Sequence, residues 1–196
     1  TRVVLQGLID GALDPGDLDN SQLRRLTTHP DPTIRELATT VISTPGPRDE
    51  LIASYRGTLE ATGDLQRGRD VFARVCANCH RMGEVGYEVG PSLPSFRNRG
   101  AEAILVNVLD PNREINPQFL AYAAATTDGR QIVGMIDSET ASSVTLRLAE
   151  GKRETIRRGD LEELRSTGVS LMPEGLERDI DLQQMADLLH FLLQEE

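Results

Sequence analysis

Two cysteines and a histidine stand together in the stretch Cys76-Ala77-Asn78-Cys79-His80. Two thiols at i and i+3, followed directly by an imidazole, form the pattern through which haem is attached covalently to a polypeptide. On a turn of helix the two sulfur atoms lie on one side, where they can form thioether bonds to two vinyl groups at one porphyrin edge. His80 then lies under the iron as an axial ligand. The spacing therefore predicts one covalently attached haem c.

A Cys-x-x-Cys pair also occurs in zinc sites and in redox disulfides. A structural zinc site needs four ligands, and the other two histidines, His29 and His190, stand far from the pair without a matching spacing. A redox disulfide lies at a strand-to-helix junction, and no strand is expected before Cys76. The haem interpretation is favoured, and a redox disulfide or an inert thiol pair is the alternative.

The charge of the chain limits its partners. The 196 residues carry a formal net charge of −10, which phosphate backbones and anionic membranes repel. Nucleic acid is therefore not expected as a partner, whereas a redox partner protein with a basic docking face is. No apolar run approaches the roughly 20 residues of a membrane helix, so no membrane segment is expected.

The compartment is inferred from the haem chemistry, because both cysteines belong to one motif and offer no disulfide framework. Bacteria attach haem to such a motif on the far side of the cytoplasmic membrane. We therefore expect an extracytoplasmic, periplasmic location. The sequence shows no export signal, and we expect it to be a piece of a longer exported protein.

Residues 1–46 are expected to form a helical, HEAT-like repeat segment. Their apolar residues recur with helical spacing in three groups: Leu5, Leu8, Ile9 and Leu13; Leu23 and Leu26; Ile34, Leu37, Ala38 and Val41. The stretch Thr44-Pro45-Gly46-Pro47 can continue neither helix nor strand. We therefore predict a domain boundary there, with a second domain over residues 47–196.

The second domain is expected to be mainly helical around the haem. Asp64 is predicted to cap a helix that ends in the haem motif, and Asp181 with Gln184 resembles a capping box for the last helix. Gly68 and Phe72 are four residues apart and share a helix face. The last helix is expected to pack against that face.

Residues 118–165 form an expected β insertion in this domain. The apolar period changes there from 3.6 to 2, and Asp128-Gly129 and Glu150-Gly151 are typical of hairpin turns. About five short strands are predicted, in a small sheet or barrel.

Four patterns together resemble the class I cytochrome c pattern: Gly68-x-x-x-Phe72, Cys76-x-x-Cys79-His80, Gly90-Pro91-x-Leu93 and Met172-Pro173. With the strand-rich insertion, and with the segments 110–112, 115–117 and 170–176, the chain from about Arg48 onward is similar to the Pirellula/Verrucomicrobium-type haem-binding domain. That domain lies at the C-terminal end of large exported proteins, after helical repeats and a dehydrogenase-like β-propeller. The resemblance implies a mainly α, cytochrome c-like fold and fused upstream domains.

The resemblance also implies the remaining haem-binding residues. Pro91 is expected to accept a hydrogen bond from the second ring nitrogen of His80 through its carbonyl oxygen. Met172, in a loop before the last helix, is expected to be the second axial ligand. Of the other methionines, Met82 is too close to His80 in sequence, Met135 falls in a predicted strand, and Met185 lies on the core stripe of the last helix.

The predicted function is electron transfer through a single haem c with His80 and Met172 as axial ligands. The chain is then not an enzyme, and no catalytic residue is predicted; it is the electron-accepting module of a larger dehydrogenase-like protein. One alternative is an open-site haem protein, peroxidase-like or gas-binding, in which Met172 does not bind. A second alternative is a docking or homodimerisation module that acts through the β insertion.

Overall fold

The computed structural model describes residues 2–10, 12–13, 18, 20–43 and 47–194. The chain divides into two compact units, Thr1–Ala53 and Ser54–Glu196. The predicted break at Thr44–Gly46 lies outside the described residues, and Pro47 already begins a helix.

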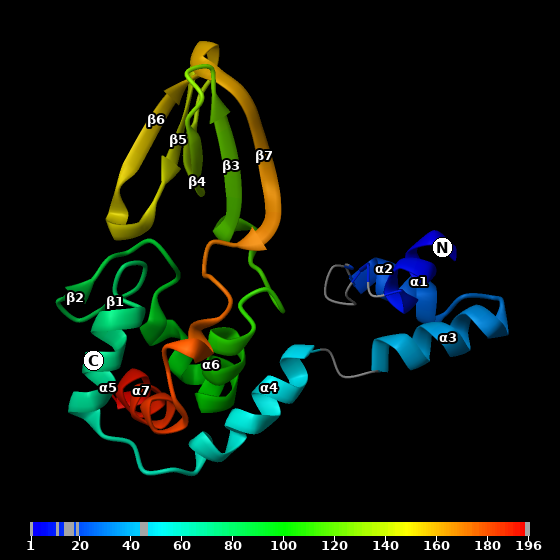
Figure 1. Ribbon diagram of the computed structural model, residues 1–196, viewed down its shortest axis with the longest axis horizontal. Helices are drawn as coiled ribbons and strands as arrows, with labels where there is room; N and C mark the ends of the chain where they lie inside the picture. Colours follow the sequence, from blue (N-terminus) through cyan, green and yellow to red (C-terminus); the bar gives the residue numbers. More distant parts are fainter. Residues whose placement is uncertain (1, 11, 14–17, 19, 44–46, 195–196) are drawn as a thin grey trace. The chain divides into compact units, whose positions relative to one another are not determined.

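The first unit is helical. It contains α1 (Arg2–Ile9), α2 (Asn20–Thr27) and α3 (Pro32–Ser43), and it includes most of α4 (Pro47–Tyr55) (Figure 1). α1 and α2 both pack on α3. Five of the residues with helical spacing form the buried core, Leu5, Leu8, Leu26, Ile34 and Ala38, whereas Ile9 and Leu37 of the same pattern are exposed.

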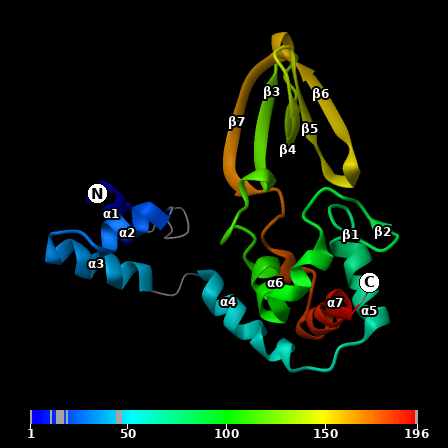
Figure 2. The ribbon, with the colours of Figure 1, turned by 180° about the vertical axis from the view of Figure 1, so that it is seen from behind.

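Three helices gather at one end of the second unit (Figure 2): α5 (Leu65–Val75), α6 (Gly100–Leu109) and α7 (Leu182–Gln194). Short elements join them, namely the 3-10 helices Arg56–Leu59, Leu93–Arg99, Pro117–Phe119 and Leu176–Arg178 and the two-residue strands β1 (Arg81–Met82) and β2 (Val85–Gly86). In the part of the chain that the structure describes, no helix is long and apolar enough to span a membrane.

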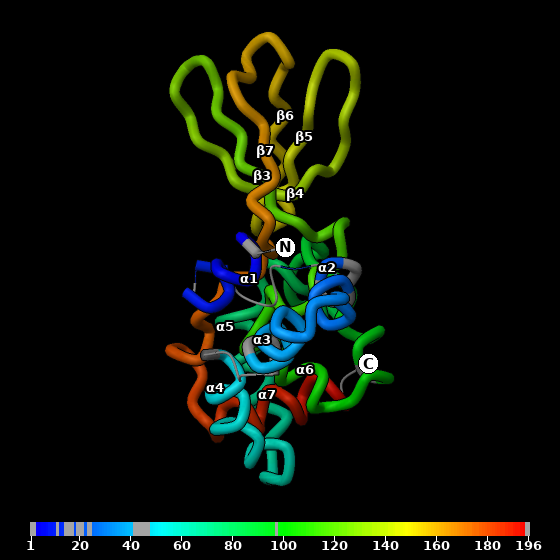
Figure 3. Tube along the Cα trace, turned by 90° about the vertical axis from the view of Figure 1, so that its right-hand side faces the viewer, coloured from blue at the N-terminus to red at the C-terminus, as the bar shows by residue number. Residues whose placement is uncertain are grey.

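A five-stranded antiparallel sheet forms the other end of the second unit (Figure 3). Its strands are β3 (Leu120–Thr126), β4 (Gln131–Glu139), β5 (Ser143–Arg147), β6 (Arg153–Arg157) and β7 (Leu161–Ser170), in the order β6-β5-β4-β3-β7. Alternating residues of β3, β5 and β6 meet in a buried core of Ala124, Val144, Leu146 and Ile156. About five short strands were predicted over residues 118–165; five are present, and β7 continues beyond that range to Ser170.

The expectation of a mainly α, cytochrome c-like fold is wrong. The described residues form a mixed α and β structure with seven α-helices and a five-stranded antiparallel sheet that takes up most of residues 120–170. The resemblance was carried by short patterns around the motif, which determine local structure only. The long segment between the motif and Met172 has an apolar period of 2, and it forms the five-stranded sheet, which is one of the two main parts of the unit.

The tightest helix contact in the second unit is the crossing of α5 and α7. A Cβ on Gly68 would lie 2.7 Å from Cβ of Phe191 and still closer to the carbonyl oxygen of Asp187. The rings of Phe72 and Phe191 pack at a centroid distance of 5.5 Å. The prediction that the last helix packs on the Gly68 and Phe72 face is confirmed.

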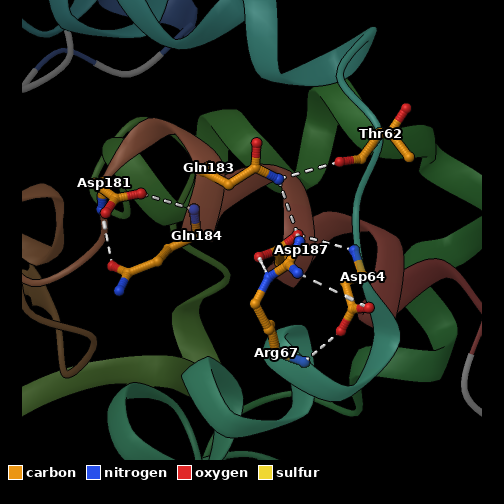
Figure 4. Close-up of polar contacts among 7 residues, drawn as sticks. All are labelled: Thr62, Asp64, Arg67, Asp181, Gln183, Gln184 and Asp187. Atoms are coloured by element: carbon orange, nitrogen blue, oxygen red, sulfur yellow. Dashed lines mark hydrogen bonds and ion pairs between the residues drawn. The ribbon is translucent and has the colours of Figure 1, made fainter.

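A buried carboxylate fixes the start of α5 against α7 (Figure 4). The Asp187 side chain is 1% exposed and accepts from Nε of Arg67 at 2.7 Å and from Nη2 at 2.9 Å. It also accepts from the backbone N–H of Asp64 at 2.8 Å and from Nε2 of Gln183 at 3.0 Å. These donors, with the Arg67 bond first, lower the pKa of Asp187 from its ordinary value of 3.8, although burial opposes them.

Both predicted helix caps are present. The Asp64 side chain accepts from the N–H of Arg67 at 2.8 Å. The N–H of Gln184 donates to the Asp181 side chain at 2.8 Å, and the N–H of Asp181 donates to the Gln184 side chain at 3.1 Å. This reciprocal pair is a capping box, so the start of α7 was determined locally by its sequence.

Substitution of Gly68 tests the helix crossing. Gly68→Ala places a methyl group against the backbone of α7, so we expect a loss of about 1–3 kcal/mol in the free energy of unfolding. Gly57→Ala is the control, because a Cβ there meets nothing within 4 Å. Urea unfolding measures both variants, and equal midpoints would contradict the close crossing.

The Asp187 network predicts a pH dependence of stability. Because the pKa of Asp187 is lower in the folded chain than in the unfolded chain, its contribution is complete above about pH 4 and is lost as the pH falls through the folded value. Asp187→Asn should lose about 1–3 kcal/mol at pH 7, and the difference from the wild type should shrink below pH 4. Asp70→Asn, which alters an exposed aspartate of α5, is the control. Stability curves that stay parallel from pH 7 to pH 3 would exclude this role.

Candidate haem site

The Cys-x-x-Cys-His stretch forms tight turns directly after α5. Cys76 ends the helix and donates its N–H to the carbonyl oxygen of Phe72 at 2.8 Å. The N–H groups of Cys79 and His80 then donate to the carbonyl oxygen of Cys76 at 3.1 and 2.9 Å. These bonds fold the stretch compactly, so both cysteines and His80 line one pocket.

The imidazole of His80 is held by the loop that follows it. The N–H groups of Val89 and Gly90 donate to the carbonyl oxygen of Cys79 at 2.9 and 2.7 Å, which folds the loop back over the motif. Nδ1 of His80 lies 3.1 Å from the carbonyl oxygen of Pro91. A Cβ on Gly90 would lie 2.5 Å from Cε1 of His80, so the ring fits only because residue 90 is glycine.

The protonation of His80 follows from these contacts. The residue is only 9% exposed, and burial lowers its pKa, with the bond to Pro91 acting in the opposite direction. The imidazole is therefore favoured in its neutral form. Because a carbonyl oxygen only accepts, the proton lies on Nδ1 and Nε2 keeps a free lone pair. A neutral imidazole with an oriented Nδ1–H is the form that binds iron.

The two cysteines are free thiols. Burial, and then the neighbouring Cys79, raise the pKa of Cys76 to about 12, and burial also raises the pKa of Cys79. Catalytic redox cysteines have lowered pKa values, because the thiolate is their reactive form. The environment of the pair therefore does not favour the redox-disulfide alternative.

A pocket of about 450 Å³ is lined by the motif, the 3-10 helix Leu93–Arg99, α6 and the segment after α6, and by Met135 and Ser170 of the sheet. All five predicted site residues line it: Cys76, Cys79, His80, Pro91 and Met172. Apolar side chains make up much of the remaining wall, including Val89, Leu93, Phe96, Ile104, Val108, Ile115, Phe119 and Leu171. The volume of the pocket and its largely apolar wall are those of a site for a large apolar ligand.

Hydrogen bonds fix the loop that carries Met172. The N–H of Ser170, at the end of β7, donates to Oδ1 of Asn112 at 2.8 Å, and the N–H of Met172 donates to Oγ of Ser170 at 3.1 Å. Nδ2 of Asn112 also donates to the Glu174 side chain. The half-buried Met172 is thus held on a fixed loop at the pocket wall.

Sequence reasoning missed two residues of this site. The sequence argues against Met135 as a ligand because it falls in a predicted strand, yet Met135 is 4% exposed and lines the same pocket. Asn112 was noted only as part of a family resemblance. Alternation shows that Met135 points to the face opposite Gly134, but it does not show which face of the sheet covers the pocket.

The prediction of a metal-binding protein needs a correction. Across residues 2–10, 12–13, 18, 20–43 and 47–194, no group of three or more His, Cys, Asp and Glu side chains could hold a metal ion. The two cysteines are separated by only two residues, and with His80 they do not form such a group. A metal ion held by the chain's own side chains, including the zinc alternative, therefore has no support.

Comparison with models of known protein families finds no match to this chain. A search of curated proteins likewise finds no similar sequence.

Thiol alkylation tests the environment of the cysteines in the chain purified without haem. With a pKa of about 12, roughly one Cys76 in ten thousand is a thiolate at pH 8, against about one in ten at its ordinary value of 9.0. Iodoacetamide followed by mass spectrometry should therefore modify Cys79 well before Cys76, and both faster once the chain is unfolded. Rapid labelling of Cys76 in the folded chain would contradict its raised pKa.

Proposed function

We propose that Cys76 and Cys79 attach one haem c, that His80 and Met172 are its axial ligands, and that the module transfers electrons. The observation that supports this most strongly is the shared pocket. It brings the two thiols, the oriented imidazole and the thioether together, although the two proposed ligands are 172 − 80 = 92 positions apart in the sequence.

The residues present fit this group in three respects. The pocket is large and mostly apolar, as a porphyrin requires. Gly90 leaves room for the imidazole ring, whose Nδ1 is bonded to Pro91. The four equatorial ligands of the iron would come from the porphyrin itself, so the chain needs to supply only two axial donors. A chain that supplies only two donors does not need a cluster of three metal-binding side chains, and the described residues contain none.

The bound haem would supply a one-electron iron couple. Histidine and methionine ligands raise the potential of such a couple. The chain's own contribution is to tether the group through two sulfur atoms, to orient His80 through Pro91, and to exclude water with the apolar wall. A tethered and fully ligated group can gain and lose an electron with little rearrangement, and this favours electron transfer over catalysis.

The wider setting is part of the same proposal. The haem-site residues resemble those of the Pirellula/Verrucomicrobium-type haem-binding domain, which supports an extracytoplasmic module of a larger dehydrogenase-like protein. The net charge of −10 supports a redox partner with a basic docking face. Such a partner would receive the electron that the module carries.

Exchange of the two pocket methionines tests the ligand assignment. In the haem-loaded chain, Met172→Leu should remove the methionine-to-iron charge-transfer band of the oxidised spectrum and yield a high-spin form that binds carbon monoxide readily. Met135→Leu is the matched control, because it changes the other pocket methionine and should keep the band. The reverse result would make Met135 the ligand, and a high-spin wild type would favour the open-site alternative.

A further inference from the structure

The turn between β5 and β6 lies at the end of the sheet that faces the helices (Figure 1), and it contacts the motif itself. Glu150, in the turn Ala149–Gly151, donates its N–H to the carbonyl oxygen of Asn78 at 2.7 Å. Asn78 lies between the two cysteines. Glu150 has φ 59° and ψ 20°, and it is the one non-glycine residue with positive φ in the described part of the chain. Such a conformation costs about 1–2 kcal/mol and persists where surrounding contacts hold it.

A second contact joins the sheet to the loop that holds His80. Nη1 of Arg147, the last residue of β5, donates to the carbonyl oxygen of Glu88 at 3.4 Å. Glu88 directly precedes Val89 and Gly90, whose N–H groups bond to Cys79 and which pack over the motif. The sheet therefore contacts both the motif and the loop that holds His80.

An ion-pair cluster holds the Arg147 side chain in place. Both Nε and Nη2 of Arg147 donate to the carboxylate of Asp137, with Nε at 2.8 Å, and Nε of Arg153 donates to its other oxygen at 2.8 Å. Asp137 is the extra residue of a β-bulge, because the register shifts between Ile136 and Ser138. A bulge changes the direction of a side chain, and here the carboxylate reaches arginines of two other strands. Nη1 of Arg147 is left to contact the loop.

The opposite edge strand of the same sheet, β7, carries the Met172 loop. Ser170, the last residue of β7, pairs with Leu120 of β3, and its hydroxyl accepts from the N–H of Met172. β3 and β4 connect this edge to the Asp137 cluster. One continuous sheet therefore holds the segment that bears His80 and the segment that bears Met172.

We infer that the inserted sheet is a clamp that sets the position of the His80 loop relative to the Met172 loop, with Asp137 and Arg147 as positioning residues. This inference gives the β insertion an internal role instead of a docking role. Its spectroscopic consequence rests on the proposed function, whereas the contacts of the clamp with the motif do not.

The first test is amide hydrogen exchange on the full chain without haem. Asp137→Asn releases Arg147, so the Val89 and Gly90 amides should exchange roughly tenfold faster, the scale of one lost charged hydrogen bond. Glu139→Gln is the matched control, because it removes a β4 carboxylate that pairs with Arg158 instead. Arg147→Lys keeps the positive charge but loses the paired N–H donors, so it should give the same acceleration. This variant replaces Asp137→Asn in the test if Asp137→Asn fails to fold. Unchanged exchange at Val89 and Gly90 in the folded variants would overturn the clamp.

The second test is the midpoint potential and oxidised spectrum of the haem-loaded variants. Asp137→Asn and Arg147→Lys should shift the potential and weaken the methionine-to-iron band, while Glu139→Gln should match the wild type. Faster exchange without any shift would overturn the link between the clamp and the ligands. A wild type that takes up no haem would refute the proposed function, and the exchange experiment would still decide whether the clamp exists.

Discussion

The architecture of the candidate site depends on one hydrogen bond, from Nδ1 of the buried His80 to the carbonyl oxygen of Pro91. Burial of an imidazole is unfavourable unless its polar atoms are paired, and this bond pairs one nitrogen while leaving the other free for a ligand. The bond requires the loop to fold back over the motif, and the fold-back requires glycine at position 90. This one bond thus determines how the His80 ring packs, which of its nitrogens carries the proton, and which nitrogen can bind a ligand.

Two layers support this bond from opposite sides. The crossing of α5 and α7, close at Gly68 and anchored by the buried Asp187, fixes the helix from which the motif emerges. The sheet contacts the motif through Glu150 and the following loop through Arg147. Met135 and Ser170 of the sheet line the pocket, so the inserted strands form part of the wall that faces the proposed haem.

Local signals in the sequence were sufficient wherever the interaction is local. The Asp64 cap, the Asp181 and Gln184 capping box, the Gly68 and Phe72 face and the alternating strands could all be predicted, because each depends on spacings of two to four residues. The mixed α and β architecture and the place of Met135 could not. Both depend on packing between segments far apart in the sequence. For Met135, that packing decides which face of the twisted, bulged sheet is turned toward the helices.

Covalent haem attachment is tested most directly by the mass of the denatured polypeptide after maturation with a bacterial haem-attachment system. We expect the mass of the chain plus one haem, retained through denaturation and lost when both Cys76 and Cys79 are replaced by serine. A wild-type polypeptide that emerges colourless, with the mass of the chain alone, would contradict it.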